Sequence, residues 1–157
     1  MPIVCYFLCN ETGRLTYKGY STNLDRRLRQ HRGYISGGAK YTKRFKSCRV
    51  ICYISGFPSK KTAMSFEWWS KRRMRRTEYQ ELCLDMCQPL HRKLFAFLKP
   101  LKKPKFSGLK ELLTINLNSD FFEPGVAECV VRFFGVKTNM VALWKITAKM
   151  LCALCEF

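Results

Sequence analysis

The chain has 157 residues, a length that suits one catalytic domain with a small extension and excludes two large lobes. Its 29 Lys and Arg residues outnumber its 11 Asp and Glu residues, and the formal net charge of +18 predicts a polyanionic partner. The charge is concentrated in the first half, because Met1–Arg76 holds 18 of the basic residues and only 3 of the acidic ones. We therefore expect the first half to meet most of that partner.

The N-terminal residues predict a β-hairpin. Its expected parts are an apolar β-prone strand, a turn and a mixed second strand, at Ile3–Cys9, Asn10–Gly13 and Leu15–Tyr20. If the turn is centred in the middle of its four residues, Tyr6 stands directly opposite Tyr17 on one face of the sheet. By strand alternation, Lys18 then points away from that face.

A short basic helix is predicted to follow the hairpin. The segment Leu24–His31 has two leucines one helical turn apart, N-cap candidates in Ser21–Asn23 and a stop signal at Gly33. Arg27 and His31 are four residues apart, so they project from one side of this helix.

The next segments combine basic and aromatic residues. A flexible Ser36–Ala39 segment leads to Lys40–Arg44, where basic residues surround Tyr41 as in nucleic-acid contacts, although a solvated loop would have the same composition. Cys48–Ser55 then predicts a third strand.

A second helix is expected from Lys60 to about Arg73, capped by Ser59. Its inward positions are predicted to be Ala63, Phe66 and either Trp69 or Ser70. Glu67 lies at the border of this stripe and is the only acidic residue between Asp25 and Glu78.

The second half gives weaker patterns. We expect helices at Glu78–Met86 and Pro89–Leu98, a linker at Pro100–Pro104, short strands at Thr114–Leu117 and Glu128–Phe134, and a helical tail. The apolar run Met140–Cys155 contains two lysines and is shorter than the roughly 20 residues of a membrane span, so we interpret it as a core-packing helix and expect no membrane partner.

The nine cysteines predict buried, reduced thiols in a protein that is not secreted, because no charged segment followed by an apolar run opens the chain. Cys152 and Cys155 have the spacing of zinc ligands, but the other candidate ligands after Arg76 are irregularly spaced. A paired-zinc module is therefore not expected.

The hairpin, the basic helix and the glutamate helix together resemble the GIY-YIG nuclease superfamily. The resemblance begins with Val4-Cys5-Tyr6 and Tyr17-Lys18-Gly19, and its five key positions are Tyr6, Tyr17, Arg27, His31 and Glu67. Longer stretches resemble the structure-specific, resolvase-type branch, at Thr16–Ser21, Arg26–His31, Gly38–Lys40, Gly56–Ser59 and Phe66–Trp68. The match covers about the first half of the chain, with a weaker echo at Pro104–Leu117.

The resemblance implies an α/β fold, with a small three-stranded, mainly antiparallel sheet flanked by helices. The expected domains are a nuclease domain at residues 1–80 and a mostly helical extension at 81–157 that packs on it. The chain departs from the pattern at Lys18, where the family has an apolar residue, and in lacking the C-terminal zinc module that docks a scaffold partner. The resemblance makes a scaffold partner possible, although the module that usually docks it is absent.

The implied function is a metal-dependent endonuclease that cuts branched DNA, such as flaps, forks and Holliday junctions. Its expected location is the nucleus, or a cytosolic or viral replication site if a virus encodes it. Glu67 is suited to hold one Mg²⁺ or Mn²⁺, and Arg27 to bind the phosphate. Family resemblance implies that Tyr6 or Tyr17 activates water. We favour Tyr6 as the base, with His31 accepting or relaying its proton.

Each site residue also has an ordinary explanation. Tyr6 and Tyr17 could form a simple cross-strand pair, Arg27 could be a solvated helix arginine, and His31 could be a helix-terminal histidine that interacts with the last carbonyls. Glu67 could pair with Lys71 at i, i+4, or with Lys60 or Lys61 through space. Only the combination at this spacing favours a site. The alternatives are another GIY-YIG role (homing, restriction or excision repair) and a basic nucleic-acid-binding protein without turnover.

The candidate DNA-binding residues are the basic side chains around the predicted site. They are Lys40, Lys43, Arg44, Lys46, Lys71, Arg72, Arg73, Arg75 and Arg76. A charge cluster of this kind can also be a solvated surface. Trp68 and Trp69 are expected mainly to pack, with stacking of one indole on a base as the alternative.

Overall fold

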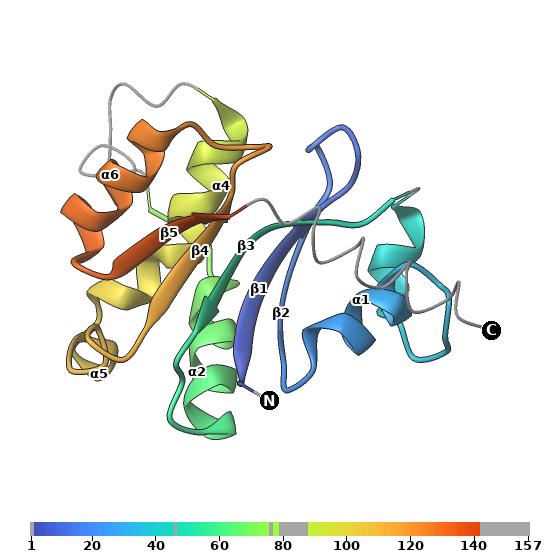
Figure 1. The fold of residues 1–157 in the computed structure, drawn as a ribbon, viewed down its shortest axis with the longest axis horizontal. Helices are drawn as coiled ribbons and strands as arrows, with labels where there is room; N and C mark the ends of the chain where they lie inside the picture. The colour runs from blue at the N-terminus through green and yellow to red at the C-terminus, as the bar shows by residue number, and fades with distance from the viewer. Residues whose placement is uncertain (1, 46, 76, 79–87, 142–157) are drawn as a thin grey trace.

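The computed structural model describes residues 2–45, 47–75, 77–78 and 88–141 (Figure 1). Its described strands form one five-stranded sheet in the order β2-β1-β3-β4-β5. The strands are β1 (Val4–Cys9), β2 (Thr16–Ser21), β3 (Arg49–Ser55), β4 (Thr114–Asn118) and β5 (Lys137–Val141). All neighbours are antiparallel except β4 and β5, which run parallel. The predicted α/β class is confirmed, but the sheet has five strands instead of three because the second half of the chain adds two.

The hairpin register differs from the predicted one. Tyr6 pairs with Gly19, and Leu8 pairs with Tyr17, so the prediction that Tyr6 and Tyr17 are directly opposite is wrong. The connecting loop is wider than a four-residue turn: the Asn10 N–H donates to the Leu15 carbonyl at 2.9 Å, and the Asn10 side chain accepts from the Leu15 N–H. The two tyrosines therefore share a face two residues out of register.

The helices begin where the capping residues predicted. They are α1 (Leu24–His31), α2 (Lys60–Ser70), α4 (Pro89–Leu98), α5 (Pro104–Ser107) and α6 (Pro124–Phe134), with 3-10 turns η1 (Lys40–Arg44) and η2 (Lys99–Lys102). Asn23 accepts from the backbone N–H of the third helical residue of α1, and Ser59 does the same for α2. The end of α2 at Ser70 is about one turn earlier than predicted.

The second half contains two corrections. The predicted strand Glu128–Phe134 lies inside α6, because Val126, Val130 and Phe134 are buried at helical spacing and Gly135 ends the helix in a left-handed conformation. The predicted linker Pro100–Pro104 is mostly η2, whose Pro100 and Leu101 are buried. The strand and helix predicted at Thr114–Leu117 and Pro89–Leu98 are confirmed.

Some predicted elements cannot be compared with the structure. Nearly all of the helix expected at Glu78–Met86 lies outside the described residues, as does the tail beyond Val141. Met140 and Val141, predicted to begin a tail helix, end β5 instead.

The two faces of the sheet carry different layers (Figure 1). One face packs against α2, α4 and α6 and holds a core that includes Phe7, Phe66 and Phe97. The opposite face holds Tyr6, Leu8 and Leu28 under α1. Because alternate strand residues point to opposite faces, neighbouring residues of β1 contribute to different layers. Tyr6 therefore faces α1, whereas Phe7 faces α2.

The described part of the second half shares this sheet and core with the first half. Leu94, Leu117 and Val130 all belong to the cluster that contains Phe7. The division into domains at residue 80 stays a prediction. None of the helices in the described residues combines the length and the hydropathy of a membrane-spanning segment.

Candidate active site

Tyr6 is the central side chain of the candidate site. Its ring is fully buried, and its hydroxyl lies over Gly19 of the edge strand β2. A Cβ atom added at Gly19 would lie 2.5 Å from the Tyr6 oxygen, a distance that real Cβ atoms do not tolerate. Glycine at this position therefore gives the phenol room to lie across β2. The sequence contains this glycine in its motif, but the reason for it appears only in the hairpin register.

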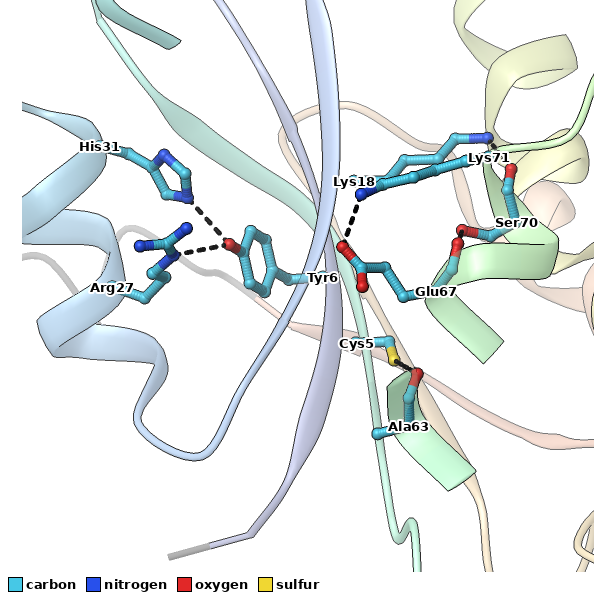
Figure 2. A network of polar contacts seen from close by, with 9 residues as sticks. All are labelled: Cys5, Tyr6, Lys18, Arg27, His31, Ala63, Glu67, Ser70 and Lys71. Carbon is cyan, nitrogen blue, oxygen red and sulfur yellow. Dashed lines mark hydrogen bonds and ion pairs between the residues drawn. The ribbon is translucent and has the colours of Figure 1, made fainter. Parts of the chain in front are cut away.

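Two side chains of α1 hold the Tyr6 hydroxyl (Figure 2). Arg27 donates from Nε at 3.2 Å, and His31 Nε2 lies 2.8 Å from the same oxygen. Arg27 is fixed in turn by Nη1, which donates to Gln30 Oε1 and to the Gly37 carbonyl, both at 3.0 Å. The spacing of Arg27 and His31 by one helical turn is what lets both reach one phenol.

The segment Ser36–Ala39, predicted to be flexible, packs tightly against the end of α1. A Cβ atom at Gly38 would lie 2.2 Å from the Gln30 carbonyl oxygen. Gly38 thus serves the close approach of two backbones, whereas Gly37 has a left-handed conformation with φ 98° that favours glycine. The Gly37 carbonyl accepts from Arg27.

Thr42 determines which nitrogen of His31 carries the proton. Its hydroxyl donates to the Ala39 carbonyl at 2.8 Å and lies 2.9 Å from His31 Nδ1. Because a hydroxyl has one proton and a carbonyl can only accept, Nδ1–H must donate to Thr42 Oγ1. Nε2 is then the bare nitrogen, and it accepts the Tyr6 O–H. Thr42 is 1% exposed and His31 4% exposed, so solvent does not compete for these bonds.

The surroundings shift the pKa values of this cluster. Burial raises the pKa of Tyr6, and the hydrogen bond and charge of Arg27 act against this rise. Burial, with the charge of Arg27, lowers the pKa of His31 to about 4. The pKa of Arg27 is raised, because contacts with the two tyrosine hydroxyls outweigh its burial. At neutral pH the protein thus presents a protonated Tyr6, a neutral His31 and a charged Arg27.

Tyr17 completes the aromatic side of the cluster. Its ring centroid lies 6.3 Å from that of Tyr6 and 4.9 Å from that of His31. The structure therefore brings together four of the five predicted residues, Tyr6, Tyr17, Arg27 and His31, although the two tyrosines are diagonal neighbours.

Glu67 approaches from the other layer. It lies on α2, on the opposite side of the strands from Arg27 and His31 (Figure 2). Its Oε1 accepts from Lys71 Nζ at 2.7 Å, and the same Nζ lies 5.9 Å from the Tyr17 ring centroid. The charge of Glu67 is also among those that raise the pKa of Tyr6. Glu67 thus acts on the two tyrosines in two ways: its charge affects Tyr6, and its ion-pair partner Lys71 lies near the Tyr17 ring on the edge strand β2.

Lys18 lies on the α2 side of β2, as strand alternation predicted. Its ammonium donates to the Ser70 carbonyl at 2.6 Å, at the C-terminal end of α2. Burial lowers its pKa to about 8, and the charge of Lys71 contributes. The motif position that is usually apolar here ties the strand to the end of the glutamate helix.

The donor set around Glu67 fits a hydrated divalent ion. No group of three His, Cys, Asp or Glu side chains that could enclose a metal occurs among the described residues. Mg²⁺ keeps several waters and needs only one or two carboxylates plus phosphate oxygens. A single partly buried carboxylate beside a basic surface is therefore compatible with such an ion.

The predicted DNA-binding residues lie on exposed surfaces around the cluster. Lys40, Lys43 and Arg44 belong to η1. Lys71 caps the C-terminal end of α2, and Arg72, Arg73 and Arg75 follow it. Lys46 and Arg76 lie outside the described residues.

The hairpin, the basic α1 and the glutamate-bearing α2 define a catalytic domain of the GIY-YIG class. Residues 2–80, about half of the chain, match the GIY-YIG catalytic domain. The chain therefore belongs to the GIY-YIG family.

Its relatives include structure-specific endonuclease subunits of the SLX1 type. It is 47% identical over 66 residues to that of Schizosaccharomyces japonicus, covering 41% of this chain and 24% of the relative. It is 40% identical over 67 residues to that of Schizosaccharomyces pombe, with 41% and 25% covered. A third, from Phaeosphaeria nodorum, is 31% identical over 140 residues, with 78% and 38% covered.

These alignments confirm the predicted structure-specific branch. The chain spans between a quarter and about two fifths of the length of these three relatives.

Proposed function

We propose that this protein is a metal-dependent endonuclease that cuts phosphodiester bonds in branched DNA, such as flaps, forks and Holliday junctions. The observation that carries the proposal is the Tyr6 hydroxyl, held between an arginine and the bare nitrogen of a buried histidine. An ordinary cross-strand tyrosine pair needs neither contact. The relatives are named structure-specific endonuclease subunits, which supports the structure of the substrate as the basis of selectivity.

The proton path follows from the hydrogen-bond directions. Tyr6 would take a proton from the attacking water while its own proton passes to His31 Nε2. The resulting imidazolium would keep its Nδ1–H bond to Thr42. Burial and Arg27 disfavour that charge in the free protein, whereas a bound phosphate would favour it. His31 would therefore release the proton again once the product leaves.

Arg27 would bind the scissile phosphate. Its Nε and Nη1 are committed to Tyr6, Gln30 and Gly37, while Nη2 donates to none of the described residues. A guanidinium fixed in this way stays charged at any working pH and presents a donor close to the Tyr6 hydroxyl. The phosphate would thus lie beside the group that activates the water.

Glu67 would hold one Mg²⁺ or Mn²⁺, which when bound supplies charge stabilisation for the phosphoryl and leaving oxygens. Lys71 now pairs with this carboxylate, but its side chain is 51% exposed and on a flexible stem. Lys71 would turn toward solvent or a DNA phosphate, and so free a Glu67 oxygen. The basic residues of η1 and of the end of α2 would supply backbone attraction.

The test compares substrates of equal sequence that differ only in branching. A fork, a flap, a Holliday junction and a linear duplex are incubated with the protein and Mg²⁺, at one salt concentration. The proposal predicts cuts near the branch point and a slow or absent reaction on the duplex. Sequence-specific nicks without regard to branching would contradict the selectivity. DNA binding without any cleavage would contradict the proposed endonuclease activity.

A further inference from the structure

One exposed indole, one partly buried indole and two cations lie beside Glu67. On α2, Trp68 directly follows Glu67, and this residue is 54% exposed. The Arg72 guanidinium lies 4.1 Å from the Trp68 ring centroid and 4.7 Å from that of Trp69. Lys103 Nζ, at the start of α5, lies 3.8 Å from the Trp69 ring centroid. We call Trp68, Trp69, Arg72 and Lys103 the indole platform.

The two indoles have different surroundings. Trp69 packs against the hydrophobic core, whereas Trp68 packs into neither hydrophobic cluster of the described residues. The rings meet edge to face, with centroids 4.9 Å apart and planes at 86°. Trp69 thus anchors the platform, and Trp68 projects from it. Packing into a hydrophobic core therefore does not explain the large, rigid aromatic side chain of Trp68.

The charge around Trp68 argues for a nucleic-acid occupant. A single exposed apolar side chain is ordinary on a protein surface, so exposure alone carries no weight. Here the Arg72 guanidinium lies over the Trp68 indole, Lys103 lies over its neighbour Trp69, and Glu67 is the only acidic residue between Asp25 and Glu78. An aromatic ring within a basic surface is the arrangement that proteins use to stack bases of single strands while cations hold the backbone.

Helix geometry places this ring next to the proposed scissile phosphate. Glu67 and Lys71 form one stripe of α2, and Lys71 reaches Tyr17 at the sheet edge. Trp68 and Arg72 form the adjacent stripe, about 100° further round the helix. A strand whose phosphate lies at Glu67 would therefore pass the Trp68 ring with a neighbouring nucleotide.

We propose that Trp68 stacks on an unpaired base next to the cleavage point, and so contributes to the selection of branched DNA over duplex. This inference rests on the proposed function, because it uses the phosphate position at Glu67. In a continuous duplex the bases stack on one another, so none offers a face to the indole without unstacking. A single-stranded arm at a branch offers such a base directly.

The test measures binding without a divalent ion, so that it does not depend on cleavage. A labelled flap with a short single-stranded arm and a blunt duplex are titrated with the parent, Trp68→Leu and Trp68→Phe at one salt concentration. Trp68→Leu should weaken flap binding roughly 5- to 150-fold, the range for loss of one stacked base, and leave duplex binding unchanged. Trp68→Phe should retain most of the affinity, because it keeps an aromatic face.

Met64→Ala is the matched control, since Met64 is exposed one helical turn before Trp68. It should bind flap and duplex as the parent does. Thermal melting of each variant checks that the fold is intact.

An abasic scan locates the partner base. The flap is prepared with one base removed at successive positions of the single-stranded arm. One position should weaken parent binding about as much as Trp68→Leu does, and should have no further effect on that variant. Additive losses, equal weakening of duplex binding, or parent-like flap binding by Trp68→Leu would each overturn the proposal. Failure of the nuclease itself would appear separately, as stacking on the single-stranded arm with no cleavage when Mg²⁺ is added.

Discussion

Replacing Thr42 with valine tests the assigned proton position directly. Valine has nearly the same shape as threonine but cannot accept from His31 Nδ1–H or donate to the Ala39 carbonyl. His31 would then either leave a buried N–H unpaired, at a cost of about 1–3 kcal/mol, or move its proton to Nε2. In the second case Nε2–H would donate to Tyr6, and the path for the Tyr6 proton would be lost.

The expected effect of Thr42→Val falls on turnover. General-base catalysis contributes about 10²- to 10⁴-fold, so kcat for cleavage of a branched substrate should fall by about 100-fold or more. KM should change little, because Thr42 is 1% exposed and its hydroxyl bonds inward to His31 and the Ala39 carbonyl, so the basic side chains of η1 stay unchanged. Thr42→Ser keeps the hydroxyl and should retain a rate within a few fold of the parent.

Nitrogen NMR of histidine reports the tautomer of His31, which would not change if Thr42 had only a structural role. The chain has only two histidines, so the signals of His31 can be assigned with one His91→Gln variant. The parent should show His31 protonated at Nδ1, and Thr42→Val should show loss or exchange of that form. A folded Thr42→Val protein with the parent cleavage rate and the parent tautomer would refute the reasoning.

Three further predictions concern Gly19, His31 and Lys18. Gly19→Ala should displace the Tyr6 phenol, and so reduce the cleavage rate strongly while DNA affinity is retained. Cleavage and binding are measured on one substrate, and a parent-like rate would show that the phenol position is not needed. Because the folded-state pKa of His31 is lowered to about 4, the unfolded state binds the extra proton first, so stability should fall as pH drops from about 6.5 to about 4. Urea unfolding should show this loss in the parent and less of it in His31→Gln. The folded-state pKa of Lys18 is likewise lowered, to about 8, so its burial penalty should be relieved as pH rises from about 8 to about 10.5, and Lys18→Met should remove this rise in stability.

Local signals in the sequence predicted most of the first half. Asn23 and Ser59 mark the helix starts because their side chains accept from backbone N–H groups of the first turn, which have no partner inside the helix. Arg27 and His31 meet at Tyr6 because residues four apart share one side of a helix. These features depend on short spacings, which the sequence contains in full.

Features that depend on longer spacing could not be predicted in the same way. The hairpin register was missed because the loop closes through Asn10 and Leu15, and turn composition alone did not distinguish this loop from a tighter one. Glu128–Phe134 has β-branched and aromatic residues that suit a strand, and only Pro124 and the burial at helical spacing decide for a helix. The addition of β4 and β5 to the sheet required pairing across about 60 residues, from β3 to β4.

Glu67 was predicted as a site residue from the family resemblance, and its isolation among basic residues agreed with that prediction. Its placement on the layer opposite α1 was not, because the direction of a helix over a sheet is set by packing of side chains such as Phe66 against Phe97. Of the three lysines considered as ordinary partners of Glu67, the structure pairs it with Lys71, the one at helical i, i+4 spacing.

The central claim is that Glu67 and the phenol of Tyr6 act together on one phosphate. The most direct measurement is the cleavage rate of one branched DNA by the parent, Glu67→Ala and Tyr6→Phe, each with and without Mg²⁺, alongside their DNA affinities. We predict metal-dependent cleavage by the parent, no detectable cleavage by either variant, and similar affinities, since basic side chains supply the attraction. Cleavage by Glu67→Ala at the parent rate, or cleavage by the parent that is unchanged without metal, would contradict the account.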